Sequence, residues 1–267
     1  MTRIWGAGER GGVRLFSYNI LDGGEGRADP LAEVIEAQRA DLVALIEADN
    51  GDVLERISKR LRMQLITGKG KRHSVALLSR WPIVRSIDHA ALPPRPDCLL
   101  EAVVRDPAGE ELTLGILHLH PHAREHNEAI REEELDSVLE VFEPHRRGRR
   151  PHLLVGDFNA NSPLQEIDPE KCKPSTREEW RKNGGNIPRS AIAKVLTAGY
   201  LDSYQALRPE EAKTRGTFST QFPGQRVDYI FTFGIGQERI KEAWIEQDRL
   251  AKYASDHFPI GVEIGSG

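Results

Sequence analysis

The sequence contains little cysteine, with only Cys98 and Cys172 among its 267 residues. Their wide separation excludes the paired spacing of a zinc finger and the framework of a small disulfide-rich domain. We therefore interpret both as free thiols in a reducing compartment. No apolar run approaches the length of a membrane span, and residues 1–20 carry scattered charges instead of the apolar segment of a signal peptide. These absences predict a cytoplasmic protein.

The sequence also lacks an excess of positive charge. Its 37 Lys and Arg residues against 41 Asp and Glu residues give a formal net charge of −4 and a pI near 6.2. This excludes the global basic footprint of a non-specific nucleic-acid binder. A polyanion would have to meet a local basic segment, either "GKGKR" at 68–72 or "HRRGRR" at 145–150, and each is typical of a solvated loop when taken alone.

Apolar residues at 39% and charged residues at 29% indicate a globular protein with a real core, in one large domain or two small ones. Helical spacing predicts helices over 29–40, 51–61, 127–143 and 189–199, and 161–187 is expected to be rich in loops. Short apolar runs predict strands over 13–21, 41–48, 74–83, 98–106, 111–120, 151–159, 226–233, 240–247 and 255–264. Because strands outnumber helices and often follow each other directly, we expect a single α/β domain with mixed sheets and outer helices.

The stretch "LLVGDFNANSP" (153–163) runs from a strand into a crowd of hydrogen-bond acceptors. Turn formation explains residues 161–163, since Asn, Ser and Pro bond or restrict the local backbone. It explains Gly156, Asp157 and Asn159 less well. These three residues are therefore candidates for a functional loop.

Other predicted strands also end or begin in carboxylates, amides and imidazoles. Such groups gathered at strand termini are what an oxygen-rich divalent-metal site with an acid–base partner requires. Taken singly, each has a structural explanation, such as a loop cap or an ion pair, but a buried carboxylate within a strand is costly unless it is paired. The residues in this set are Asn19, Glu47, His118, His120, Asp157, Asn159, Asp228, Asp256 and His257.

Seven motifs follow one another along the chain: "SYNI", "LIEAD", "LLSRWPI", "LHLH", "VGDFNA", "RVDYIF" and "SDHFPI". Their order resembles the endonuclease/exonuclease/phosphatase superfamily from Val13 to Ile260. This superfamily includes pancreatic-type deoxyribonucleases, abasic-site endonucleases, sphingomyelinases and inositol-polyphosphate 5-phosphatases. The resemblance implies a four-layer α-β-β-α sandwich of two packed mixed sheets with outer helices, over 13–267, with 1–12 as an N-terminal extension. Histidine within "ILHLH", where abasic-site endonucleases have tyrosine, resembles the deoxyribonuclease and sphingomyelinase branches.

The resemblance implies a metal-dependent hydrolysis of a phosphate ester by direct attack of water. Glu47, with Asn19 and Asp256, is expected to hold Mg²⁺ or Mn²⁺. The ion neutralises charge on the phosphoryl oxygens, and Mg²⁺ typically takes one or two carboxylates and keeps waters and phosphate oxygens as its other ligands.

The remaining site residues are expected to serve as acid, base and positioning groups. Asp157 orients or deprotonates the water, and Asn159 positions it. His257, held by Asp228, contacts the phosphate and is the competing candidate for the base. His118 stabilises the charge of the transition state or protonates the leaving oxygen.

The substrate stays open between a nucleic-acid phosphodiester, which we favour, and a small phosphoester or an inositol or lipid headgroup. A strand rises by roughly 3.3 Å per residue, so the strand before Asp157 places residues 145–150 more than about 10 Å from the expected active site. The sequence does not fix the position of residues 68–72 relative to that site. A zinc hydrolase using His118, His120 and His122 is a remote alternative, as is a non-catalytic binding module on the same fold. The oligomeric state is also left open.

Overall fold

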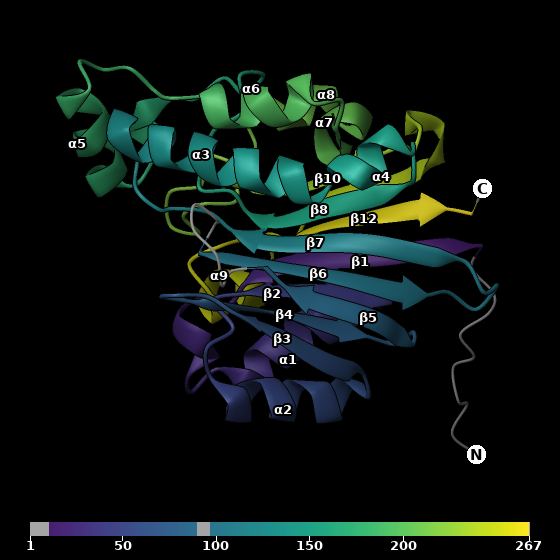
Figure 1. Ribbon diagram of the computed structural model, residues 1–267. Coiled ribbons are helices and arrows are strands. Elements are labelled where there is room, and N and C mark those ends of the chain that lie inside the picture. The colour runs from purple at the N-terminus through teal and green to yellow at the C-terminus, as the bar shows by residue number, and fades with distance from the viewer. Residues whose placement is uncertain (1–10, 90–96, 267) are drawn as a thin grey trace.

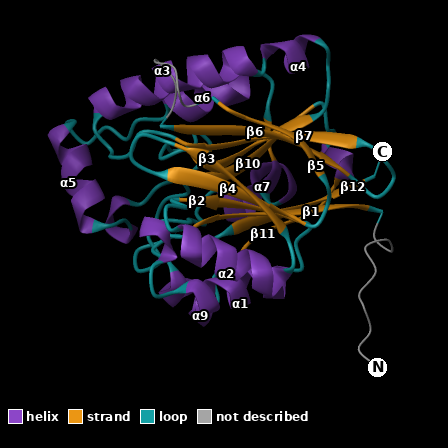
Figure 2. Ribbon diagram, turned by 60° about the horizontal axis from the view of Figure 1, so that its bottom comes forward, coloured by secondary structure: helices purple, strands orange, loops and turns teal. Residues whose placement is uncertain are grey.

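Two six-stranded mixed sheets pack face to face, with helices on their outer faces, in the computed structural model, which describes residues 11–89 and 97–266 (Figures 1 and 2). The first sheet has the strand order β11-β12-β1-β2-β4-β3, and the second has the order β5-β6-β7-β8-β10-β9. The predicted single-domain α-β-β-α sandwich is therefore confirmed. The expected N-terminal extension over 1–12 lies almost entirely outside the described residues.

The strands are short, and most of them are buried. The first sheet contains β1 (Gly12–Asn19), β2 (Leu42–Ile46), β3 (Gln64–Lys69), β4 (Ser74–Ser79), β11 (Ile240–Ile245) and β12 (Ile260–Gly265). The second contains β5 (Ile83–Asp88), β6 (Cys98–Arg105), β7 (Glu111–His118), β8 (His152–Asp157), β9 (Leu201–Asp202) and β10 (Asp228–Phe233). The expected hairpin of β6 and β7 is present as an antiparallel pair.

Each sheet has one parallel pair at its centre, β1 with β2 and β7 with β8, and the other pairings are antiparallel. Parallel neighbours end at the same edge of a sheet, so their last residues meet. Asn19 therefore lies opposite Ile46, and His118 lies opposite Asp157. Because β10 runs antiparallel to β8, its first residue, Asp228, also faces Asp157. This register brings polar residues from three strands to one edge of the second sheet.

Helices cover both outer faces. In Figure 1, α1 (Ala28–Gln38) and α2 (Gly51–Leu61) lie below the first sheet, and α3 (Glu125–Val141), α4 (Glu143–Arg147) and α6 (Ser190–Thr197) lie above the second. The short helix α7 (Ser203–Leu207) contacts β10 and β11, one strand from each sheet. The remaining helices are α5 (Pro174–Lys182), α8 (Pro209–Ala212) and α9 (Arg249–Ala254).

Apolar side chains form two buried clusters. The larger lies between the two sheets and extends to α1 and α2, and the smaller lies between the second sheet and the helices α3 and α6. All five residues of β2 are buried, which explains its unbroken apolar run. Burying one such side chain stabilises the fold by about 1.5–3 kcal/mol, so this core holds the strand ends rigidly. Within the described ranges, no helix combines the length and the apolar character that crossing a membrane requires.

Most expected element boundaries differ from the structure by one or two residues, and three expectations differ by more. The strand expected over 74–83 ends at Ser79, and a separate strand, β5, begins at Ile83. The loop expected over 161–187 contains the helix α5. The strand expected over 255–264 begins only at Ile260, so Asp256 and His257 lie in the preceding loop. There the Ser255 hydroxyl donates to the carbonyl of Asn19 and accepts from the His257 N–H, and these bonds replace a strand ladder.

Candidate active site

A buried triad of Asp157, Asp228 and His257 lies at the edge where β8 ends and β10 begins. One ligand-type atom of each residue lies within 4.8 Å of the others. His257 Nδ1 is 2.9 Å from Asp228 Oδ2, the contact that the sequence led us to expect. The other ring nitrogen, Nε2, is 3.7 Å from Asp157 Oδ2. Asp228 therefore fixes the ring so that Nε2 faces Asp157.

The charges of the three side chains in the triad shift the pKa values of their neighbours. Burial alone would lower the pKa of His257, but the carboxylates of Asp228 and Asp157 outweigh it and raise the pKa to about 10. Burial raises the pKa of Asp157 to about 7, and the neighbouring charge of Asp228 acts in the same direction. His257 is thus held as a cation, whereas Asp157 can exchange a proton near neutral pH.

His118, the last residue of β7, lies next to Asp157 as well. Its Nε2 is 3.7 Å from Asp157 Oδ2, and its Nδ1 is buried with no hydrogen-bond partner in the described part of the chain. Burial lowers the pKa of His118 to about 4, although the charge of Glu47 opposes the shift. The site therefore holds one charged and one neutral imidazole against the same carboxylate oxygen.

The loop after β8 keeps Asp157 in place. The backbone N–H of Asn159 donates to Asp157 Oδ1 at 2.8 Å, and Asn159 Nδ2 donates to the carbonyl of Leu119 at 3.0 Å. At Gly156, φ is 141°, and a Cβ would lie 2.0 Å from the carbonyl oxygen of Leu117. Only glycine allows β7 to approach so closely at this point.

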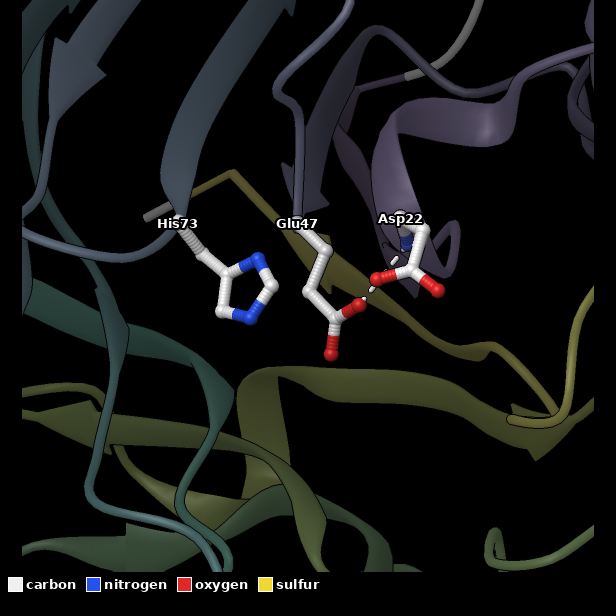
Figure 3. Close-up of side chains that lie close together, drawn as sticks. All are labelled: Asp22, Glu47 and His73. Atoms are coloured by element: carbon white, nitrogen blue, oxygen red, sulfur yellow. Dashed lines mark hydrogen bonds between the residues drawn. The ribbon is translucent and has the colours of Figure 1, made fainter.

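A second cluster consists of Asp22, Glu47 and His73, whose ligand-type atoms also lie within 4.8 Å of one another (Figure 3). Glu47 Oε2 accepts from the backbone N–H of Asp22 at 2.9 Å, and Oε1 accepts from Asn19 Nδ2 at 3.0 Å. Burial raises the pKa of Glu47, but the hydrogen bonds from Asp22 and Asn19 outweigh it and leave the pKa below its usual value. Glu47 is therefore a charged carboxylate.

Asn19 connects the two clusters. Its Nδ2 donates to Glu47 Oε1 and, at 3.1 Å, to Asp157 Oδ2, while its Oδ1 accepts from the backbone N–H of Leu21 at 3.0 Å. The side chain expected to bind metal thus holds two carboxylates at a fixed separation. In this geometry its oxygen faces the Leu21 backbone.

Asp256, the third expected metal ligand, lies beside His257 and outside both clusters. Its Oδ1 is 4.0 Å from His257 Nε2 and is buried, with no hydrogen-bond partner among the described residues. A buried carboxylate oxygen without a donor is costly unless a cation compensates it. Asp22 and Glu47 supply carboxylate oxygens of the kind that Mg²⁺ or Mn²⁺ prefers, and Asp256 lies outside their cluster. The residues present therefore fit a divalent metal.

Sequence reasoning missed Asp22 and His73 as members of the site. Asp22 lies three residues after Asn19, in the same loop after β1. His73 directly precedes β4, which pairs antiparallel with β2 through Val75 and Ile46, so the start of β4 meets the end of β2. The proximity of His73 to Glu47 can be recognised only when the pairing of β2 and β4 is known.

Three non-glycine residues of the site have left-handed backbone conformations. The φ angles are 48° at Asp22, 56° at Glu47 and 49° at Asn159. Such conformations cost free energy at most residue types and persist where the surrounding structure enforces them. Their concentration here supports a functional role for the three loops that follow β1, β2 and β8.

The structure does not support the alternative zinc site. The strand β7 ends at His118, His120 Nε2 lies 2.9 Å from Asn127 Nδ2, and the His122 side chain is 63% exposed beside Glu179. Neither potential metal cluster within 11–89 and 97–266 contains this trio. The rings of His120 and His122 lie 6.5 Å apart between centroids, but both residues lie beyond the end of β7, so strand alternation does not align them with His118.

The two basic segments lie at different ends of the sandwich. Lys71 and Arg72 belong to the loop between β3 and β4, and Arg72 Nη2 lies 3.5 Å from His120 Nδ1. Both side chains line a surface groove next to the site, together with Asp97, His120, Ile130, Glu133 and Glu134. The segment 145–150 leads into the opposite end of β8, as expected.

The two-sheet sandwich, with a carboxylate–histidine cluster beside a potential metal cluster, defines a hydrolase that acts on phosphoester bonds. The chain belongs to the Endonuclease/Exonuclease/phosphatase family, whose model matches residues 16–257.

Two kinds of comparison agree with this family. The DNA repair nuclease APEX1 of Danio rerio is 32% identical over 121 residues, which are 42% of this chain and only 36% of that protein. An AP endonuclease from Archaeoglobus fulgidus shares the fold with a TM-score of 0.69 at 18% identity, covering 94% of this chain and 99% of its own. The 3′ phosphatase NExo from Neisseria, bound to a product DNA hairpin, gives a TM-score of 0.71 at 18% identity, with the same coverage of 94% and 99%. The structural matches show the fold alone.

Proposed function

We propose that this protein is a divalent-metal-dependent phosphodiesterase of nuclease type that activates water for direct attack on phosphorus. The observation that carries the proposal is the convergence on Asp157 Oδ2. Asn19 Nδ2 lies at 3.1 Å from this oxygen, and the Nε2 atoms of His118 and His257 each lie at 3.7 Å. A carboxylate oxygen between an amide and two imidazoles can receive a proton while its neighbours stabilise an anion.

Glu47 and Asp256, supported by Asn19, would hold Mg²⁺ or Mn²⁺, and the position of Asp22 adds it to this set. When bound, the ion supplies positive charge to the phosphoryl oxygens. Asn19 keeps the Glu47 carboxylate turned toward the substrate side, because the Asn19 amide donates to it.

Asp157 accepts the proton of the attacking water, and Asn159 positions that water beside it. His257 presents Nε2 to the phosphoryl group, since its Nδ1 is committed to Asp228. His118 approaches from the opposite side and hydrogen-bonds the charge that develops on the phosphoryl or leaving oxygen.

A nucleic-acid substrate is supported by the surroundings of the site. Lys71 and Arg72 offer positive charge to a phosphate backbone from the adjacent groove, which is also lined by Asp97, Glu133 and Glu134. Phe222 is 38% exposed on a loop whose Thr220 N–H donates to the carbonyl of Asp256 at 2.9 Å. An exposed aromatic ring so close to the metal-binding loop can stack on an unpaired base. The Neisseria phosphatase of the same fold is itself bound to DNA.

A side-by-side hydrolysis assay tests this proposal, with Mg²⁺ and with plasmid, single-stranded DNA, RNA, inositol phosphates and sphingomyelin as substrates. We expect DNA or RNA to be cleaved, and the double substitution Lys71→Glu with Arg72→Glu to raise KM in a salt-dependent way. Arg147→Glu with Arg149→Glu, at the opposite end of β8, is the matched control. Turnover of a small phosphoester alone, at a rate that the first double variant leaves unchanged, would contradict the nuclease assignment.

A further inference from the structure

His73 is an imidazole beside the active site that the proposed reaction does not use, and it is held in place from three directions. Its backbone N–H donates to Asp97 Oδ2 at 3.2 Å, and its carbonyl accepts from the Cys98 thiol at 2.6 Å. Its ring Nδ1 lies 2.8 Å from Asp49 Oδ2. Two aspartate carboxylates and a thiol thus fix the position of this partly buried histidine.

The contact with Asp49 determines which ring nitrogen is available. The Asp49 carboxylate is itself anchored, because its Oδ1 accepts from the backbone N–H of Ser74 at 2.6 Å. When Nδ1–H donates to this carboxylate, the lone pair of His73 resides on Nε2. A carboxylate that orients a histidine in this way is the usual partner behind a metal-bound imidazole.

The ring is directed at the carboxylates of the second cluster. Figure 3 shows the His73 imidazole facing the carboxylate of Glu47, with Asp22 on the far side of Glu47. One nitrogen of His73 and one oxygen each of Asp22 and Glu47 lie within 4.8 Å of one another. Two carboxylates and one imidazole, from three different loops, thus surround one small volume.

We propose that His73 is a metal ligand that, together with Asp22 and Glu47, makes this site prefer Mn²⁺ or a later first-row transition ion to Mg²⁺. Mg²⁺ takes oxygen ligands and retains water, so an imidazole adds little to its affinity. Transition ions gain from a nitrogen ligand, and their affinity for mixed nitrogen and oxygen sites rises along the series from Mn²⁺. The inference deepens the proposed function, because Glu47 is the metal-binding carboxylate of that reaction.

A competing role for His73 is contact with the substrate. Its ring centroid lies 5.5 Å from that of His118, so the imidazole also borders the place where a phosphate would sit. The two roles differ in one measurable respect. A metal ligand changes the affinity for the ion when no substrate is present, whereas a substrate contact does not.

The test is a Mn²⁺ titration of the full chain after chelator treatment, followed by the electron paramagnetic resonance signal of free Mn²⁺, with Mg²⁺ as competitor. We expect wild-type protein to bind Mn²⁺ at least about tenfold more tightly than Mg²⁺. His73→Gln should lose about tenfold or more of the Mn²⁺ affinity and little of the Mg²⁺ affinity, and Asp49→Asn should shift Mn²⁺ binding in the same direction by a smaller factor. His122→Gln, which changes an exposed histidine outside the cluster, is the matched control and should bind both ions as wild type does.

Equal Mn²⁺ affinity in wild type, His73→Gln and Asp49→Asn would overturn the inference. A raised KM for DNA in His73→Gln with unchanged metal binding would also overturn it, and would assign the residue to the substrate. Hydrolysis with saturating Mg²⁺ is measured separately. A protein that binds Mn²⁺ through His73 but hydrolyses no phosphoester would contradict the proposed function and leave this inference standing.

Discussion

Asp157 and Asp228 lie directly opposite each other across the antiparallel strands β8 and β10, so two buried carboxylates share one histidine. Like charges at this distance repel, and the pair is stable because His257 lies between them as a cation. The same arrangement divides their roles. Asp228 holds the ring of the histidine through Nδ1. Asp157 Oδ2 lies 3.7 Å from Nε2 of His257 and 3.7 Å from Nε2 of His118.

We expect Asp157→Ala and His257→Ala each to reduce turnover by about two orders of magnitude or more, since losing one such group commonly costs ~2.7–4 kcal/mol of barrier. Steady-state assays of the DNA or phosphoester substrate measure the effect, and circular dichroism checks that the fold is kept. Near-wild-type activity in either variant would remove that residue from the mechanism.

Substituting Asp228→Asn should lower the pKa of His257, because the anion that most favours the imidazolium is removed while the size of the side chain is kept. The pKa of His257 in wild-type protein is raised to about 10, and the variant should titrate at lower pH. NMR titration of the His257 ring signals gives this value directly. We expect kcat to fall at the same time, whereas an unchanged ring titration would show that Asp228 does not control the charge of His257.

Glu134 predicts a pH dependence of stability that is separate from catalysis. Burial raises the pKa of Glu134 from 4.5 to about 7, because the folded protein favours the neutral acid. The contribution of Glu134 to the free energy of unfolding should therefore fall as the pH rises from about 4.5 to about 7, by on the order of 3 kcal/mol, and change no further above that range. Denaturant melts of wild type and Glu134→Gln test this. The difference in free energy of unfolding between the two proteins should change by that amount across the range, and a difference that is independent of pH would contradict the assignment.

Arg226 anchors the start of β10 from behind the site. Its buried guanidinium lies 2.7 Å from Asp202 Oδ2, at the edge strand β9, and over the ring of Tyr229. Asp202→Asn keeps the shape but leaves a buried cation unpaired, so we expect a loss of about 3–5 kcal/mol in the free energy of unfolding. Glu210→Gln, in the exposed pair with Lys213, should cost at most about 1 kcal/mol. An equal loss of free energy of unfolding in the two variants would show that the buried ion pair contributes no more to stability than the exposed one.

The sequence alone determined the class of fold and most of the polar residues at the strand ends. Apolar runs of strand length and an amphipathic helix over 127–143 are local patterns, so mixed sheets with outer helices could be predicted from them. The four-layer sandwich was implied by the resemblance of the motifs to a known family. Asp157 and His257 could be identified as candidate site residues from the sequence. A polar group directly beside a buried strand conflicts with its apolar surroundings unless it has a function.

Only the tertiary structure decided which of these residues meet. His73 and Glu47 are joined because β4 pairs with β2, and Asp228 meets Asp157 because β10 pairs with β8. These pairings are non-local, and no spacing along the chain encodes them. The same cause explains why Asp256 and His257 lie in a loop and not in a strand, since hydrogen bonds from Ser255 to a distant strand end fix that loop. A residue pattern specifies the strands, whereas the register between strands places their side chains in one site.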